Sequence, residues 1–523
     1  EAEPAERPVV VGELYLEYHR GTYTSQAATK RGNRRCERAL HDAEFLSCLR
    51  GGDYPRDELA RLWKLLLLNQ FHDILPGSSI RWVTEEAEAQ LAEVQRRADA
   101  VAGDALDEIA AAVDTSGFVE PAVVFNPTPF ARRGVVDIAG RPRPVDVPPL
   151  GWTTISTAPV AAGPDREVSV GQGWMDNGRI RLEWDAEGCL SRVLDLDHDR
   201  EVLTDGAVGN LFQLHEDRPK DYDAWDVDRD YLDHVTDLVG PALTAPVDIE
   251  VVSDGGLRGA VRFRRRFGQS VIDQTMVLTA GSRQVDFVTD VDWHEDHKFL
   301  KVAFPVAVHA PAARFETQFG HLARPTHANT PFEQARFEVC AQRWADLSEA
   351  GFGVALLNDC KYGYDVRGHT MRLSLLRAPT APDPLCDRGR HRFTYALLPH
   401  GGDLVPVIAA GYALGAPLQV RRPGAGAAPA GQAPGQHCLV QVSDPGFVVE
   451  TVKTADDGRG VIVRGYEALG GRRRVRLVPG VACTAAVRTD LLERDGAAVP
   501  LTEDGAVELT VRPFELVTLR LSP

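Results

Sequence analysis

The stretch NQFHDILPGSS, residues 69–79, shapes the N-terminal part of the chain because it ends a long leucine-rich segment. Pro76 and Gly77 stop any helix that runs into them. If that helix extends through position 72, Leu68 and His72 lie on one face, four residues apart. We predict that this face is buried and that His72 lies where the helix leaves the core.

The His72–Asp73 pair has side chains that suit a metal and a sugar. A neutral imidazole can bind a metal, and the neighbouring carboxylate can accept hydrogen bonds from hydroxyl groups. The alternative is a structural histidine near a helix end, with Asp73 in solvent. One histidine is not a metal site, because a catalytic zinc takes about three protein ligands.

Three segments in this part of the chain have helical character. Residues 56–73 carry apolar residues at helical spacing and acidic residues in the first turn, where the helix dipole favours negative charge. Residues 80–113 are rich in Ala, Glu, Leu and Arg and contain no Pro. Together with residues 34–50, they predict an antiparallel three-helix bundle over residues 31–114.

After Asp114 the sequence changes to short strands. QVDFVTDVDWHE (284–295) places Val285 and Phe287 on one face and Asp286 on the other, which is typical of a half-buried antiparallel strand. Many strands without alternating helices favour β-sandwiches over a parallel sheet. The predicted fold class is therefore α+β and multidomain, with a three-helix bundle followed by all-β sandwich domains.

Composition limits the function classes. The 523 residues carry a formal net charge of -17, which argues against a nucleic-acid-binding surface. The eight cysteines form no C-x-x-C pair and indicate a reducing compartment. Because the sequence shows no membrane span and no signal peptide, we predict a cytoplasmic protein without nucleic-acid or membrane partners, and homo-oligomerisation is left open.

Several segments, in order along the chain, resemble glycoside hydrolase family 38, the retaining α-mannosidases, in its cytosolic and bacterial branch. LWKLLLLNQFHDILPGSSI (62–80) is similar to the family's His–Asp segment, and GELYLEYHRGTYTSQAATKRGNRRCERAL (12–40) to the segment upstream of it. Downstream, the resemblance rests on FQLHEDRPKDYDAWDVD (212–228), VDWHEDHKFLKVAFPV (291–306) and GFGVALLNDCKYGYDVRGH (351–369).

The resemblance implies a function and a site. Family members hydrolyse α-linked mannose in oligosaccharides through a covalent glycosyl-enzyme intermediate, with one carboxylate as nucleophile and a second group as acid. A divalent cation, usually zinc with cobalt or manganese as alternatives, holds two hydroxyls of the mannose. By resemblance, His72 is one ligand of this metal and Asp73 hydrogen-bonds a sugar hydroxyl.

The resemblance also implies a domain order. The expected domains are a remnant of the catalytic α/β domain (1–30), the three-helix bundle or central domain (31–114), a small β domain (118–160), a large β-super-sandwich of the galactose-mutarotase type (165–405), and a C-terminal β domain (406–523) with a linker near 422–435.

One part of the family pattern has no counterpart in the sequence. No segment resembles the family's H-x-D metal motif or its nucleophile segment. The triplets His215/Asp217 and His294/Asp296 occur after the helices, and we expect them at strand ends or in loops. We therefore predict no catalytic nucleophile in this chain, which would be a C-terminal part of a longer enzyme and inactive alone.

Four further residues are predicted to contact substrate. Tyr18 lies in EYHRGTYTS, where it either lines the sugar pocket or packs at the domain junction. Asp217 and Trp225 lie in DRPKDYDAWDVD. They are predicted to contact substrate because an indole ring can stack on a sugar and a carboxylate can accept hydrogen bonds from its hydroxyl groups. An ordered surface loop is the alternative. Tyr364 lies in the glycine-punctuated loop NDCKYGYDVRG.

Two other functions stay open from the sequence. The chain could be a non-catalytic module that binds carbohydrate or serves as a scaffold. It could also be another carbohydrate enzyme with a mutarotase-like sandwich, such as an epimerase or a lyase. Hydrolysis of an aryl α-mannoside and retention of metal distinguish these functions from a mannosidase.

Overall fold

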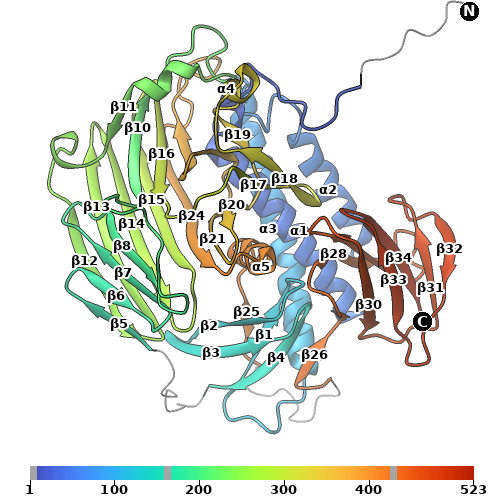
Figure 1. The fold of residues 1–523 in the computed structure, drawn as a ribbon. Helices are drawn as coiled ribbons and strands as arrows, with labels where there is room; N and C mark the ends of the chain where they lie inside the picture. The colour runs from blue at the N-terminus through green and yellow to red at the C-terminus, as the bar shows by residue number, and fades with distance from the viewer. Residues whose placement is uncertain (1–8, 158–166, 424–432) are drawn as a thin grey trace, which may run out of the picture.

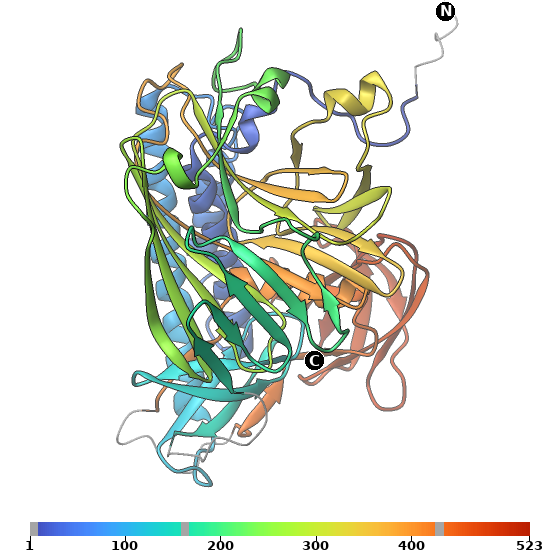
Figure 2. The same ribbon diagram turned by 60° about the vertical axis from the view of Figure 1, so that its left-hand side comes forward.

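The computed structural model describes residues 9–157, 167–423 and 433–523. The chain is mostly β-sheet with few helices, and its sheets form sandwiches (Figure 1). In Figure 1 the green strands of the large sandwich lie on the left and the C-terminal sheets (red) on the right. In both views the yellow strands of the sandwich lie beside the red sheets (Figure 2), and residues of the two parts share a buried core. None of the helices in the described residues is long and apolar enough to cross a membrane.

The three helices predicted near the N-terminus are present. They are α1 (Ala27–Arg50), α2 (Arg56–Asn69) and α3 (Arg81–Ala112). Two shorter helices follow later in the described chain, α4 (Pro331–Ala335) and α5 (Leu404–Gly415). Leucines of α1, α2 and α3, among them Leu40, Leu62 and Leu91, share one buried core.

The predicted extent and buried face of α2 are wrong. The helix ends at Asn69, and His72 lies in the turn that follows. The buried face consists of Leu59, Leu62, Leu66 and Asn69, whereas Leu68 is 57% exposed. Four consecutive leucines allow more than one helical face to look apolar, so the pattern alone did not fix the buried one.

Two antiparallel sheets form the large sandwich. Apolar side chains from both sheets fill the space between them, as where the rings of Phe287 and Phe304 lie 5.8 Å apart. The first sheet has the strand order β18 (Gly320–Pro325), β17 (Ala312–Thr317), β20 (Trp344–Glu349), β21 (Phe352–Asn358), β24 (Gly389–His400), β15 (Val285–Trp293), β14 (Ser270–Thr279), β13 (Arg258–Phe267), β12 (Asp248–Gly256), β5 (Val168–Gly171), β6 (Trp174–Asp176), β7 (Ile180–Trp184), β8 (Leu190–Asp195) and β9 (Arg200–Glu201).

The second sheet of the sandwich is shorter. Its order is β11 (Val235–Asp237), β10 (Leu211–Glu216), β16 (Lys298–Pro305), β23 (Thr370–Arg377), β22 (Gly363–Arg367) and β19 (Val339–Cys340). The alternation predicted for QVDFVTDVDWHE is confirmed in β15, where Val285 and Phe287 are buried and Asp286 is partly exposed.

Smaller sheets complete the described chain. The small β unit has the order β25 (Gln419–Arg421), β1 (Pro121–Asn126), β4 (Gly151–Ser156) and β26 (Gln436–Cys438), next to the hairpin β2 (Arg132–Ile138) and β3 (Arg141–Val147). The C-terminal sheets are β27 (Val440–Val442), β30 (Arg473–Pro479) and β33 (Val507–Val511), and β28 (Phe447–Thr454), β29 (Val461–Glu467), β34 (Leu516–Ser522), β31 (Ala485–Thr489) and β32 (Asp495–Val499).

Residues 404–438 differ from the predicted division of the chain. Helix α5 packs its Val407 and Ile408 against residues of the large sandwich, and β25 and β26 pair with the open edges of β1 and β4. This pairing covers sheet edges that would otherwise expose backbone groups. Much of the predicted linker (424–432) and the predicted boundary near 160–165 lie outside the described residues.

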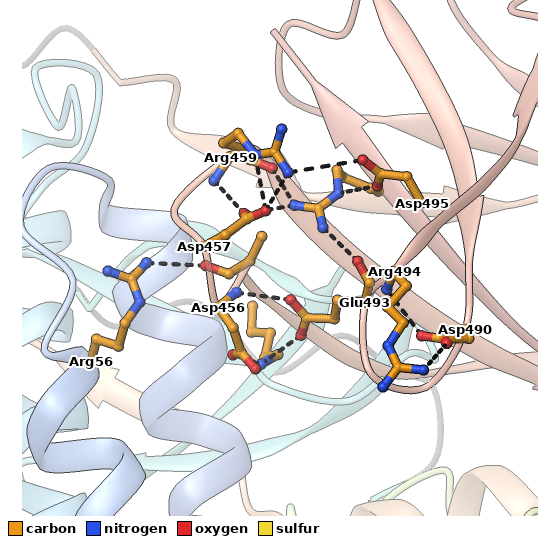
Figure 3. A network of polar contacts seen from close by, with 11 residues as sticks. Arg56, Asp456, Asp457, Arg459, Asp490, Glu493, Arg494 and Asp495 are labelled. Atoms are coloured by element: carbon orange, nitrogen blue, oxygen red, sulfur yellow. Dashed lines mark hydrogen bonds and ion pairs between the residues drawn. The ribbon is translucent and has the colours of Figure 1, made fainter.

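The C-terminal sheets connect to the helices through a polar network (Figure 3). Arg56 at the start of α2 donates from Nη2 to the carbonyl oxygen of Ala455 at 3.0 Å. In the same loop, the backbone N–H of Asp456 donates to Glu493 at 2.8 Å, and Arg520 donates to Asp457 at 2.8 Å. The loop is thus held from both sides, which fixes the C-terminal sheets against α2.

Candidate functional site

The loop between α2 and α3 carries His72, and its backbone is held by short-range hydrogen bonds. The N–H of Ile74 donates to the carbonyl of Phe71 at 2.9 Å, and the N–H of Gly77 donates to the carbonyl of Ile74 at 3.0 Å. Residues 70–77 therefore form consecutive turns instead of a continued helix.

Asp73 organises the second half of this loop. Its Oδ1 accepts from the Ser78 hydroxyl at 2.8 Å, and its carbonyl oxygen accepts from the Ser79 hydroxyl at 2.7 Å. The two serines thus close the loop onto Asp73. The carboxylate of Asp73 remains 41% exposed, so its second oxygen can accept a further hydrogen bond.

A buried lysine of α1 fixes the loop from below. The Nζ of Lys30 donates to the carbonyl oxygens of Leu75 at 2.9 Å and Pro76 at 3.0 Å, and also to Ser25 at 2.5 Å. Lys30 is 3% exposed, and its burial lowers its pKa to about 7. One ammonium group therefore satisfies three carbonyls and joins the loop to the N-terminal turn of α1.

Gly77 allows the loop to approach α1 closely. Its φ is +84°, and a Cβ atom at this position would lie 2.3 Å from the carbonyl oxygen of Ser25. Only glycine fits both the left-handed backbone and this contact. The sequence PGSS after His72–Asp73 therefore has a structural reason: it folds the loop back onto α1 and onto Asp73.

The side chain of His72 points away from the core. It is 76% exposed, and its Nε2 lies 3.4 Å from Asp73 Oδ2. Its ring packs against that of Phe71, with centroids 4.2 Å apart. Three large apolar side chains close to His72 in the sequence, those of Phe71, Leu68 and Trp82, are 54%, 57% and 72% exposed. We call His72 and these three side chains the His72 face.

The described residues do not form a complete metal site. No group of three or more His, Cys, Asp or Glu side chains in residues 9–157, 167–423 and 433–523 is arranged to hold an ion. The exposed imidazole of His72 fits the role of one ligand, with the Asp73 carboxylate beside it. The other metal ligands would have to come from residues other than those that the structure describes, at the His72 face.

The structure places Asp217 in the interior. Asp217 is 1% exposed, its Oδ2 accepts from Arg377 Nε at 2.6 Å, and burial raises the pKa of its carboxyl. Arg377 also donates to the Ser25 hydroxyl at 3.1 Å and to the carbonyl of Asp226 at 2.8 Å. The prediction that Asp217 binds substrate is therefore not supported, because its carboxylate serves to hold a buried arginine.

Trp225 and Tyr18 lie near the same junction. The carbonyl oxygen of Trp225 accepts from the backbone N–H groups of Gly21 at 2.8 Å and Thr22 at 3.2 Å, and its side chain is partly exposed. Tyr18 is 61% exposed and packs edge-on against Tyr222, with ring centroids 6.1 Å apart. This geometry joins the two segments at a junction, and both rings keep surface on which a sugar could stack.

Tyr364 is enclosed inside the large sandwich. Its side chain is fully buried, its hydroxyl accepts from Asn358 Nδ2 at 2.6 Å, and it donates to the carbonyl of Leu356 at 3.2 Å. Because Tyr364 is buried, the prediction that it contacts a sugar is not supported. The sequence suggested an open loop, but Tyr364 lies in β22, whose first four residues (363–366) are all buried.

The two H-x-D triplets do not act as units. Burial lowers the pKa of His215 to about 4, and its ring Nδ1 lies 3.1 Å from the carbonyl of Tyr231. His294 pairs with Asp292 at 2.9 Å, while Asp296 pairs with Arg388. In each triplet the histidine and the aspartate have separate partners.

Sequence reasoning missed the residues that support the His72 loop. Lys30 gave no local signal, because a lysine in an exposed-looking helix is ordinarily solvated. Ser78 and Ser79 offered a weak signal, since serines after a helix end often bond to nearby backbone groups.

All eight cysteines lie in the described residues and are free thiols.

Comparison with known proteins identifies the family. The Alpha mannosidase middle domain matches residues 17–109, the Glycosyl hydrolases family 38 C-terminal domain matches 175–385, and the family 38 C-terminal beta sandwich domain matches 446–519. The chain belongs to glycoside hydrolase family 38, and the resemblance seen in the sequence is confirmed.

Two curated relatives match nearly the whole chain or most of it. The chain is 43% identical to "Alpha-mannosidase 2C1" of Homo sapiens over 98% of its length and 50% of that protein. It is 34% identical to "Alpha-mannosidase G" of Dictyostelium discoideum over 88% of its length and 48% of that protein. The chain thus spans about half the length of the curated relatives that it matches.

A crystal structure supports the fold. An alpha-mannosidase from Enterococcus faecalis superposes with a TM-score of 0.83 at 16% identity, over 99% of this chain and 70% of that one. At this identity, the likeness concerns the arrangement of the helices and sheets.

Proposed function

We propose that the protein that contains this sequence is a metal-assisted, retaining α-mannosidase acting on mannose-containing oligosaccharides. The observation that carries the proposal is the 43% identity to an alpha-mannosidase over 98% of the chain. Retaining hydrolysis uses a nucleophilic carboxylate and an acid on opposite sides of the scissile bond. No residue of this chain is assigned to either role.

His72 is the proposed metal ligand of this half of the enzyme. Its imidazole is exposed on a loop that Lys30, Ser78 and Gly77 hold in place, as positioning of a ligand requires. A divalent cation bound there would act as a Lewis acid on sugar hydroxyls and orient the ring. Zinc is the proposed ion, with cobalt or manganese as alternatives.

Asp73 is the proposed sugar contact beside the metal. Its backbone and one carboxylate oxygen are used by Ser79 and Ser78, which leaves the other oxygen for a substrate hydroxyl. Tyr18 and Trp225 stay proposed contacts of lower rank, because their rings are accessible but lie at a domain junction.

The apolar His72 face is the proposed contact for the remaining half of the enzyme. Leu68, Phe71 and Trp82 are close to the candidate ligand in the sequence and each is more than half exposed, and exposed apolar patches mark contact surfaces. Polypeptide corresponding to the other half of the relatives would cover it and supply the other metal donors. The large sandwich is proposed to be of the galactose-mutarotase type, as predicted from the sequence.

The test is hydrolysis of an aryl α-mannoside by the protein expressed from its complete coding sequence, with metal content measured in parallel. His72→Ala is expected to lose the metal. We also expect kcat/KM to fall by more than the roughly 10- to 100-fold that is typical when a residue hydrogen-bonded to a metal ligand is changed. His309→Ala, at an exposed histidine of the large sandwich, is the matched control. Full metal content and activity in His72→Ala would refute the assignment. Turnover by the 523 residues alone would refute the prediction that they lack the nucleophile.

A further inference from the structure

A cavity of about 630 Å³ lies where the helices meet the large sandwich, α5 and the C-terminal sheets. Its size is within the range of roughly 300–1,000 Å³ that is usual for small-molecule sites. Gln70 and Leu75 line it, whereas the side chain of His72 is exposed to solvent. The cavity therefore borders the same loop as the His72 face but is a separate space.

The cavity offers hydrogen-bond acceptors that are only partly used. The Oε1 of Glu37 accepts from Asn33 at 3.2 Å and from Gln70 at 3.0 Å, and no described residue donates to its Oε2. Glu450 of β28 accepts from the hydroxyl of Tyr412 through Oε2, and no described residue donates to its Oε1. Each carboxylate can thus accept from a ligand.

The cavity also offers donors. Arg34 donates from Nε to the Tyr362 hydroxyl at 3.4 Å and from Nη2 to Gln342 at 3.0 Å, and no described residue accepts from its Nη1. Arg343 uses Nε for Glu316 at 2.9 Å and packs over the ring of Tyr412 at 3.7 Å. Its terminal nitrogens have no acceptor among the described residues.

The charges of these four groups cancel. Two guanidinium groups, of Arg34 and Arg343, stand against two carboxylates, of Glu37 and Glu450. The wall also carries Arg38, Asp42, Glu44 and Asp359, so its carboxylates outnumber its guanidinium groups, and an anionic ligand would meet an excess of negative charge. A neutral molecule with many hydroxyl groups can donate to the carboxylates and accept from the guanidinium groups at once.

An aromatic side chain in a strained turn adds a flat apolar surface. Phe319 lines the cavity in the two-residue turn between β17 and β18, where its φ is +58°. A bulky residue rarely adopts this left-handed conformation, which favours Gly or Asn, and such strain is concentrated at functional sites. Phe319 is 42% exposed, so part of its ring is free to stack on the C–H face of a sugar.

We propose that this cavity is a binding site for a neutral saccharide of one or two rings, held by Arg34, Arg343, Glu37 and Glu450 and stacked on Phe319. The site is independent of the proposed hydrolysis, because none of these residues belongs to the His72 loop. A sugar bound in the cavity would contact Gln70, which lies at the start of that loop.

The experiment measures binding of d-mannose and methyl α-d-mannoside to the full-length protein carrying His72→Ala, which weakens the proposed active site. Calorimetry is expected to give a Kd in the millimolar range, near −4 kcal/mol. Mannose 6-phosphate, which is anionic, is expected to bind at least tenfold more weakly. A crystal soaked with d-mannose should show the sugar in this cavity.

Two further variants separate binding from folding. Glu450→Gln is expected to weaken sugar binding about tenfold, whereas Glu85→Gln, at an exposed pair with Arg81, leaves it unchanged. Phe319→Asn relieves the left-handed turn, so we expect an equal or higher Tm together with weaker binding. No binding of either sugar, sugar bound only elsewhere, or unchanged affinity in Glu450→Gln would overturn the proposal.

Whether the enzyme hydrolyses α-mannosides does not affect this test. If hydrolysis fails but sugar binds in the cavity, the binding site is supported and the proposed function is refuted. If hydrolysis is seen but no sugar binds in the cavity, the proposed function is supported and the binding site is refuted.

Discussion

The Nζ atom of Lys30 lies 2.9 Å from the carbonyl oxygen of Leu75, and this contact joins α1 to the loop that carries His72. The position of the candidate ligand therefore depends on α1 as well as on α2, which leads into the loop. Because Lys30 is buried and has three carbonyl partners, small changes there should move the loop without touching His72.

Lys30→Met is expected to lower the free energy of unfolding by about 2–3 kcal/mol, because it leaves buried carbonyl oxygens without a donor. Amide hydrogen exchange should increase in residues 71–79 before it increases elsewhere. Lys64→Met, at an exposed position of α2, is the control and should change neither quantity. Unchanged exchange in the loop would show that Lys30 does not hold it.

The same lysine predicts a pH dependence. Burial lowers the pKa of Lys30 to about 7, whereas the unfolded chain keeps the ordinary value of 10.5. Between these values the unfolded state binds more protons, so this group makes the free energy of unfolding rise with pH from about 7 to 10.5. Below pH 7 both states are protonated and the contribution is constant.

Urea unfolding of the wild type and Lys30→Met over that pH range checks the sign. The stability gap between the two proteins should widen as pH rises above about 7. A gap that narrows with pH would contradict a lowered pKa.

Gly77→Ala tests the close approach between the loop and α1. A Cβ atom at this position would lie 2.3 Å from the Ser25 carbonyl oxygen, so the loop must shift, and we expect a loss of roughly 3 kcal/mol or more together with reduced metal binding. Gly52→Ala is the matched control. Gly52 has a similar φ of +72° but open space around it, and its substitution should cost only about 1 kcal/mol. Equal losses in the two variants would mean that the backbone angle alone matters.

The sequence predicted the helices and the strands well, because their patterns are local. The alternation in β15, for example, depends only on neighbouring residues. The buried face of α2 was predicted wrongly, because four consecutive leucines leave the face to be chosen by distant packing partners.

The site was harder to predict than the fold. His72 and Asp73 came from a family resemblance, whereas Lys30 supports their loop from 42 or more positions away in the chain, and no local pattern links them. Tyr364 and Asp217 have side chains suited to sugars, and only tertiary structure shows that both are buried. Residue type indicated chemistry in these cases, but accessibility depends on how strands align across the sandwich.

Asp217→Asn decides between a structural and a substrate-binding role for Asp217. The carboxylate and Arg377 are both buried, with Oδ2 and Nε 2.6 Å apart, so removing the negative charge leaves a buried guanidinium uncompensated. We expect a loss of about 3–5 kcal/mol in the free energy of unfolding. Asp296→Asn is the control, because its pair with Arg388 is partly exposed and should contribute less than about 1 kcal/mol.

Kinetics of the folded Asp217→Asn protein complete the argument. A structural aspartate predicts an unchanged KM for an aryl α-mannoside at temperatures well below the Tm, since no substrate group would lose a partner. A substrate contact predicts a raised KM with little change in Tm. The second result would restore Asp217 as a sugar-binding residue, and would require the segment 217–228 to open and release Arg377 when substrate binds.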